Sequence, residues 1–401
     1  MIRSVLMGIG YSAAILALVT LICIVQGQFN LIVGFDFLFW DAKHLHHIAI
    51  HGYDFTRTAF FPLFPAIWSS TGLSAGGISI LNGLLFLCAL ACFKEVLLVE
   101  KRQFMLLLSI PSVIFFFLPY SEALLFLLSI GFIWSMHRSK LHTTLVFLVL
   151  ISLTKPTVAI LLPAVMIVES NGSEPLGQKL KRMGMFTLAI LLGNSLAFLI
   201  QYMQTGEWFQ FFEAQTAWGN KLSMPNFPLS TWNQPRAIWF DSIAFWFSIV
   251  CGCLAGICIH RYYKHHKSID KLYMYSLLVI AGTGLYVLLF RGGSLFSLNR
   301  FVLISPFLFV VLIRTKENFD LKAKPLLLLT FLSFFTVATF FGSYLHIRTL
   351  LEYAMLSSLL SIWLYVFFGF GKSSLFYMLI SIMALIQVRV VFLVLNGEWI
   401  G

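Results

Sequence analysis

The amino-acid sequence predicts an all-α, polytopic transmembrane protein. Of its 401 residues, 59% are hydrophobic and only 11% are charged, and the mean hydropathy is +0.90. A water-soluble core cannot bury so much apolar surface, so lipid must be the main solvent. Uncharged stretches of roughly 20 residues, the length that crosses a bilayer, recur from end to end. We therefore expect about 11 to 13 membrane helices in a single membrane domain over residues 1–401.

The first membrane helix is expected over residues 6–25, directly after Arg3. The positive-inside rule then places the N-terminus in the cytoplasm, and because no small-residue cleavage site follows, we interpret this helix as a retained signal anchor. With alternating spans, the segments expected in the cytoplasm hold Lys101, Arg102, Arg138, Lys140, Lys179, Lys181, Arg182, Arg261, Lys264, Lys267, Lys271, Arg314, Lys316, Lys322 and Lys324. The net charge of +11 is thus a topology signal. The sequence has no basic face interleaved with aromatic residues, so it gives no indication of nucleic-acid binding.

The cysteines give no sign of a disulfide framework or a zinc site. All six lie inside apolar stretches, at Cys23, Cys88, Cys92, Cys251, Cys253 and Cys258. None lies in a polar loop, which argues against disulfides and against a zinc site.

Three polar segments are expected on the non-cytoplasmic side: residues 26–65, 204–240 and 291–300. Each places aromatic residues beside charges, which is typical of an interfacial belt and also of a groove for a lipid or a sugar. The apolar run 143–168 is interrupted by Lys155 and Pro156. Because a lysine at the bilayer centre would cost several kcal/mol, we expect two short helices that meet at an outward-facing turn.

The first outer loop has the densest chemistry. Residues 35–65 contain three carboxylates, four histidines and two cations. On a helix, Asp41, His44, His47 and His51 share one face, and Leu45, Ile48 and Ala49 fill much of the adjacent surface. This pattern predicts an amphipathic helix at the membrane interface, with Asp41 placed as a general base. Two alternatives stay open: the polar face only meets lipid headgroups, or His47 and His51 bind a metal, although no companion acid completes a metalloprotease pattern.

The same loop resembles a known family. The patterns WDAxH, IAxHGY and AFFPxFP occupy residues 40–44, 48–53 and 59–65. Their order and spacing are similar to the first luminal loop of the PIG-V family, the GPI mannosyltransferases that add the second mannose, and of their prokaryotic relatives. Weaker matches are PYSEAL at 119–124 and LTKP at 153–156, and the residue-level resemblance is firm only from about residue 36 to 125. The resemblance makes His44 and His51 part of a signature, which weakens the case for a metal.

The resemblance implies the GT-C fold of membrane glycosyltransferases, with a polyprenyl- or dolichyl-phosphate-linked sugar as donor. In that family an acid in the first outer loop activates the acceptor hydroxyl, and the sugar is transferred with inversion and without a cofactor or an obligatory metal. On this sequence the role falls on Asp41, with Asp36 in reserve.

Displacement at the anomeric carbon also needs positive charge near the leaving phosphate. Arg300 and Lys155 are the first candidates and Arg291 the next, although Arg300 could instead snorkel at a helix end. The residues expected to contact substrate are His44, His51, Tyr53, Glu122, Gln215 and Trp218.

The expected function is transfer of a hexose, mannose by resemblance, to a glycan, glycolipid or protein acceptor on the non-cytoplasmic face. The membrane would be a bacterial plasma membrane, or the endoplasmic reticulum in a eukaryote. The C-terminal third holds no motif for a GPI-precursor acceptor, and prokaryotes with such proteins make no GPI anchors, so the sugar and the acceptor stay open. The rival interpretations are a transporter or scramblase of lipid-linked sugars and a non-catalytic subunit of a glycosylation complex.

Overall fold

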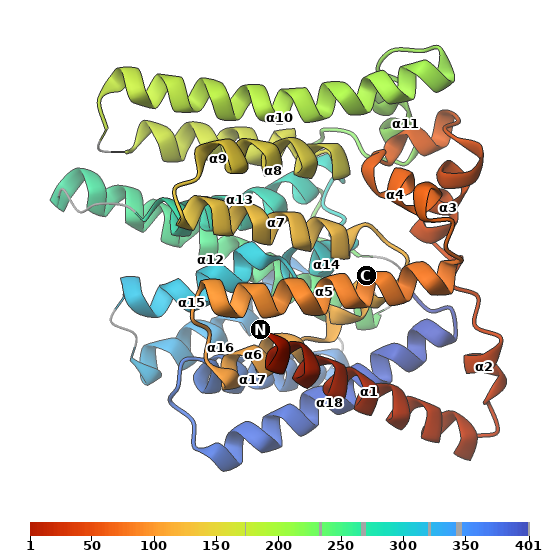
Figure 1. The fold of residues 1–401 in the computed structure, drawn as a ribbon. Coiled ribbons are helices and arrows are strands. Elements are labelled where there is room, and N and C mark those ends of the chain that lie inside the picture. The colour runs from red at the N-terminus through yellow and green to blue at the C-terminus, as the bar shows by residue number, and fades with distance from the viewer. Residues whose placement is uncertain (173, 232–234, 266–269, 320–321, 342–346, 400–401) are drawn as a thin grey trace.

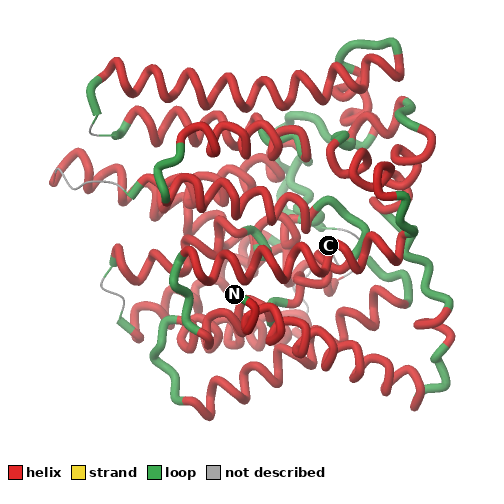
Figure 2. The backbone as a smooth tube through the Cα atoms, viewed as in Figure 1, coloured by secondary structure: helices red, strands yellow, loops and turns green. Residues whose placement is uncertain are grey.

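The computed structural model describes the chain except for residues 173, 232–234, 266–269, 320–321, 342–346 and 400–401. The described residues form helices and loops, and their only β-type pairing is an isolated bridge between Ser230 and Ser294. Figure 1 and Figure 2 show the helices stacked side by side with their axes broadly aligned. The expectation of an all-α, polytopic membrane protein is confirmed at this level.

Fewer long helices are present than the sequence suggested. In the described residues, eight helices are long and apolar enough to cross a membrane, and a ninth is possible where η2 (Pro111–Phe117) and α7 (Glu122–His137) meet at 101°. The eight are α1 (Ile2–Val25), α5 (Ala75–Val96), α10 (Leu176–Thr205), α12 (Pro235–His265), α13 (Lys271–Phe290), α16 (Ala323–Phe340), α17 (Ile347–Phe367) and α18 (Ser373–Leu395). The expected 11 to 13 helices included some too short or too polar to be full spans, and the structure contains such shorter helices: α6 (Lys101–Leu108), α8 (Leu141–Thr154), α9 (Val158–Ser170) and α15 (Pro306–Asn318).

The predicted break at Lys155 is confirmed. Helix α8 ends at Thr154, Lys155 is extended (φ −149°, ψ 154°), and α9 begins at Val158. Pro156 disfavours the helical conformation for the residue before it. With 14 residues, α8 is about 21 Å long at 1.5 Å per residue, less than the roughly 30 Å of a hydrocarbon core. Because α8 is shorter than the core, Lys155 at its end lies within the helix assembly, at the junction of α8 and α9.

The polar outer segments gather at one end of the assembly (Figure 1). They form α2 (Asn30–Val33), α3 (Asp41–His51), η1 (Phe55–Ala59), α4 (Leu63–Thr71) and α11 (Gln210–Ala217). The loop that joins α7 to α8 and the first turns of α10 and α13 lie at the opposite end. Arg138, which follows α7, and Lys179, in the first turn of α10, belong to that opposite end, whereas Lys267 lies outside the described residues.

A phenylalanine cluster holds the turn between η2 and α7. Phe86 of α5 stacks on Phe116 at 4.1 Å between ring centroids and meets Phe126 at 5.3 Å. Nearby, the Asn82 side-chain amide donates to the carbonyl oxygens of Leu118 (2.7 Å) and Tyr120 (2.9 Å). These bonds satisfy buried carbonyl groups in the bend. Glu122, the first residue of α7, is thereby fixed in the interior.

Candidate active site

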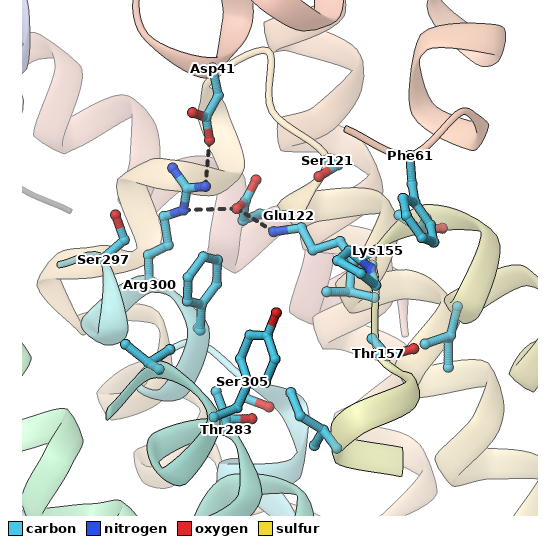
Figure 3. A pocket seen from close by; sticks show the side chains of 18 of the residues that line it. Asp41, Phe61, Ser121, Glu122, Lys155, Thr157, Thr283, Ser297, Arg300 and Ser305 are labelled. Carbon is cyan, nitrogen blue, oxygen red and sulfur yellow. Dashed lines mark hydrogen bonds and ion pairs between the residues drawn. The ribbon is translucent and has the colours of Figure 1, made fainter. Parts of the chain in front are cut away.

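A cavity of about 320 Å³ lies beneath the end of the molecule that α3 and α11 cover. It is bordered by α3, α7, the break between α8 and α9, α13, and the short α14 (Leu298–Val302). Its charged lining residues are Asp41, Glu122, Lys155, Arg291 and Arg300. Figure 3 shows four of them, from four separate regions of the sequence, joined in one row of ion pairs.

Asp41 enters the cavity from the first turn of α3. The helix Asp41–His51 forms as predicted, with Leu45 and Ile48 buried beneath it. One carboxylate oxygen of Asp41, Oδ2, pairs with Arg300 Nη2. In the described part of the chain, Oδ1 accepts no hydrogen bond, and the side chain is 26% exposed. A carboxylate that is fixed but still reachable suits a general base.

Arg300 lies at the centre of the row of charges. Its guanidinium Nε is 3.0 Å from Glu122 Oε1, and the side chain is only 7% exposed. Burial acts against the charged form, but Asp41 and Glu122 outweigh it and raise the pKa of Arg300 above its ordinary value. A buried, doubly paired guanidinium does not snorkel toward water, so the alternative role considered for Arg300 does not fit its position.

Glu122 connects Arg300 to Lys155. Lys155 Nζ donates to Glu122 Oε1 at 2.7 Å, the same oxygen that faces Arg300. The Glu122 side chain is 4% exposed. Its carboxylate is thus engaged by two cations. The sequence prediction that it contacts substrate is consistent with its place in the cavity wall, but its observed contacts are to protein.

Arg291 supplies a third cation from the C-terminal end of α13. Its Nε donates to Asn220 Oδ1 at 3.1 Å, and its Nη1 donates to the Phe296 carbonyl oxygen. Burial, and then the nearby Arg300, lower the pKa of Arg291. All three cations that the sequence assigned to a donor phosphate therefore line one cavity.

Gln215, within α11, and Trp218, directly after it, form the outer lip of the cavity. The Trp218 indole N–H donates to the Thr56 carbonyl oxygen at 3.0 Å. The Asn220 amide donates to Gln215 Oε1 at 2.7 Å and so joins this lip to Arg291. Asn220 was not predicted from the sequence, since an asparagine two residues after a tryptophan carries no pattern of its own.

His44 lies beside the cavity. Its ring stacks on Phe60 with centroids 5.3 Å apart and meets the edge of Trp218 at 5.0 Å. Burial lowers the pKa of His44, and the nearby Asp41 only partly opposes this effect. The imidazole is therefore biased toward its neutral form, which can still donate one hydrogen bond and accept another.

Three other predicted residues do not line the cavity. His51 is exposed and lies against His47, with ring centroids 4.8 Å apart. The Tyr53 hydroxyl is committed to the Phe60 carbonyl oxygen at 3.0 Å. Asp36 accepts a hydrogen bond from the Leu38 backbone N–H. In this structure, therefore, His51 and Tyr53 are not placed to contact a molecule in the cavity, and Asp36 is not placed as a second base.

Away from the charges, the cavity becomes apolar. This arm lies between α9, α13 and α15, and its lining includes Ile160, Leu161, Val279, Val287 and Phe307. Figure 3 shows Thr157 and Thr283 at its border. One cavity thus offers both a charged end and a hydrocarbon-like end.

A buried acid that the sequence analysis did not single out supports α14. Asp241 of α12 is fully buried, and its Oδ1 accepts from both the backbone N–H (2.8 Å) and the side-chain amide (2.9 Å) of Asn299. Its Oδ2 accepts from the Thr231 hydroxyl. The signal was present, because an acid within an apolar membrane helix is a functional candidate by default.

The fold and the cavity define a polytopic α-helical membrane protein with a charged site at one end of its helices. Comparisons with protein-family models, with curated proteins and with solved structures found no match. Among the described residues, no three histidine, cysteine, aspartate or glutamate side chains are grouped so as to hold a metal ion.

Proposed function

We propose that this protein is a membrane glycosyltransferase of the GT-C type, which transfers a hexose from a polyprenyl- or dolichyl-phosphate carrier to an acceptor hydroxyl. The observation that carries the proposal is the single cavity in which Asp41 faces Arg300 and Lys155 beside an apolar arm. A lipid-linked sugar phosphate has the same three parts: a sugar, an anionic phosphate and a hydrocarbon chain.

The charges of the cavity support a monophosphate donor. Three cations and two carboxylates leave one net positive charge. A sugar linked to a lipid by one phosphate is a phosphodiester with a single negative charge, so its binding neutralises the site. A diphosphate carrier would bring a second negative charge without a matching cation. Buried charges are tolerated only when they are paired in this way.

The proposed reaction is a direct displacement. The acceptor hydroxyl attacks the anomeric carbon while its proton passes to Asp41, through the oxygen Oδ1 that is not held by Arg300. The bond between the anomeric carbon and the phosphate oxygen breaks, and its electron pair leaves with the lipid phosphate. The phosphate gains negative charge during this step. Arg300 and Lys155 are fixed in advance beside it, which is the arrangement that stabilises a developing anion.

Three further points of the proposal rest on sequence. The resemblance of the first outer loop to the PIG-V family favours mannose as the hexose. The acceptor, a glycan, glycolipid or protein, would enter past Gln215 and Trp218 at the outer lip. The site would face the non-cytoplasmic side of a plasma or endoplasmic reticulum membrane; the positive-inside rule supports this, because basic residues of α10 and of the loop between α7 and α8 lie at the end opposite to the cavity.

Transfer can be measured with purified protein, polyprenyl-phospho-mannose labelled in the sugar, and a lipid extract as the source of acceptor. We expect label in a new product and no transfer by Asp41→Asn. Asp36→Asn is the matched control, because Asp36 belongs to the same loop but does not line the cavity. Full activity of Asp41→Asn would refute the assigned base.

The same preparation discriminates the rival classes. Movement of labelled lipid across liposomes without covalent transfer would replace the proposal by a scramblase or transporter. Transfer that requires a second purified protein would indicate a non-catalytic subunit. Label in product with this chain alone would exclude both.

A further inference from the structure

We propose that Trp399, in the segment that follows α18, is a positioning residue of the active site. It holds Arg300 and the start of α3 in the geometry that brings Asp41 and Arg300 together. The kinetic test of this inference rests on the proposed function. The test by hydrogen–deuterium exchange does not.

A defined turn brings Trp399 back into the helix assembly. Helix α18 ends at Leu395, and Gly397 adopts a left-handed conformation (φ +74°). The Gly397 N–H donates to the Val394 carbonyl oxygen at 2.9 Å, and the Glu398 N–H donates to the Leu393 carbonyl oxygen at 3.0 Å. This pair of bonds is a Schellman motif, which ends a helix and fixes the direction of the chain after it. The path to Trp399 is thus set by hydrogen bonds.

Trp399 is 4% exposed and packs behind the site. The Arg300 guanidinium carbon lies 5.5 Å from the Trp399 ring centroid. Phe115, Tyr120 and Phe301 bring three more rings within 5.7 Å of the same carbon. A guanidinium inside an aromatic cage has few orientations open to it. Of these four rings, that of Trp399 comes from the segment after α18.

Trp399 also supports the residue before the assigned base. Its ring centroid lies 5.0 Å from that of Trp40, which caps α3 directly before Asp41. Trp40 has φ +52° and ψ −129°, a conformation that a bulky side chain rarely adopts. Such a conformation persists only where surrounding packing enforces it. One indole therefore contacts both Trp40, the residue directly before α3, and Arg300, the residue that pairs with Asp41.

Kinetics test the proposal through a comparison of four proteins. Trp399→Ala should lower kcat by about 10- to 100-fold, because a small misplacement of a catalytic group costs that much, with less than about a threefold change in the donor KM. Trp399→Phe keeps an aromatic ring and should stay within about threefold of wild type. The matched control is Trp363→Ala, since Trp363 is 5% exposed and stacks on Phe367 in α17. Equal losses of kcat in the two alanine variants would overturn the proposal.

Hydrogen–deuterium exchange tests the same geometry without any reaction. Trp399→Ala should speed exchange in peptides that cover residues 36–48 and 294–303, and Trp363→Ala should not. Unchanged exchange in both peptides would overturn the positioning role even if transfer were lost. If wild type transferred no sugar at all, the proposed function would fail while this measurement still decided the role of Trp399.

A second pair of variants leaves Trp399 itself in place. A Cβ at Gly397 would meet no atom within 4 Å, so the effect of substitution comes from the backbone alone. Asparagine tolerates a left-handed conformation and valine does not. Gly397→Val should therefore reproduce the faster exchange at 36–48 and 294–303, and Gly397→Asn should resemble wild type. Identical exchange in the two variants would contradict the route that we assign to this segment.

Discussion

Replacing Glu122 by glutamine should destabilise the protein strongly, because the carboxylate lies between two buried cations. Its Oε1 is 2.7 Å from Lys155 Nζ and 3.0 Å from Arg300 Nε, and the side chain is 4% exposed. At an effective dielectric constant of about 20, each contact corresponds to a Coulomb attraction of roughly 5 to 6 kcal/mol before desolvation is subtracted. Removing one partner of a buried pair typically costs about 3 to 5 kcal/mol. We expect the Glu122→Gln variant to lose about 3 to 5 kcal/mol of unfolding free energy.

The origin of that loss can be isolated with a second substitution. Lys155→Met removes the cation and leaves an apolar side chain of similar length, so Glu122→Gln combined with Lys155→Met no longer holds an unpaired lysine. The double variant should be less destabilised than the sum of the single variants by about 2 to 3 kcal/mol, the upper range for residues in direct contact.

Unfolding in mixed micelles of mild detergent and dodecyl sulfate gives the free energies for this cycle. Asp36→Asn combined with Lys155→Met serves as the control cycle, because Asp36 does not line the cavity. If the effects of Glu122→Gln and Lys155→Met add within about 0.5 kcal/mol, the two residues do not interact. The row of charges described above would then be wrong.

Three further predictions follow from the site. Asp241→Asn turns an amide toward the N–H groups of Asn299, so it should lower the unfolding free energy by about 1 to 3 kcal/mol. It should also reduce transfer, because Arg300 follows Asn299 and would be displaced. Unchanged transfer would show that Asp241 does not position Arg300. Because burial lowers the pKa of His44, the folded state resists protonation, so stability should be full above the ordinary pKa of about 6.5 and decline as pH falls below it. Unfolding measured from pH 8 to 5 should show a shallower decline for His44→Gln and an unaltered one for the exposed control His142→Gln. Chelation with EDTA should leave transfer at its initial rate, and loss of transfer that added divalent ions restore would contradict a metal-independent displacement.

The helix α3 and the break at Lys155 could be predicted because each depends on neighbouring residues. The spacing of Leu45 and Ile48 defines the buried face of α3. Pro156 ends helix α8 by disfavouring the helical conformation at Lys155. His51 shares a face with Asp41 but does not line the cavity. Residues that share a helical face differ in height, and the ten residues from Asp41 to His51 correspond to about 15 Å along the axis. A shared helical face therefore does not bring His51 to the cavity that Asp41 lines.

The pairing inside the cavity could not be derived in the same way. Asp41 and Arg300 are 259 positions apart, and which helices lie side by side depends on the packing of apolar faces that resemble one another in composition. Sequence could still restrict the possibilities, because a charge in the interior of a membrane protein must find an opposite charge. Arg300, Lys155 and Glu122 were each recognisable as charges beside apolar helices. What the fold added is that Glu122, the acid expected to contact substrate, lies between the two cations and pairs with both.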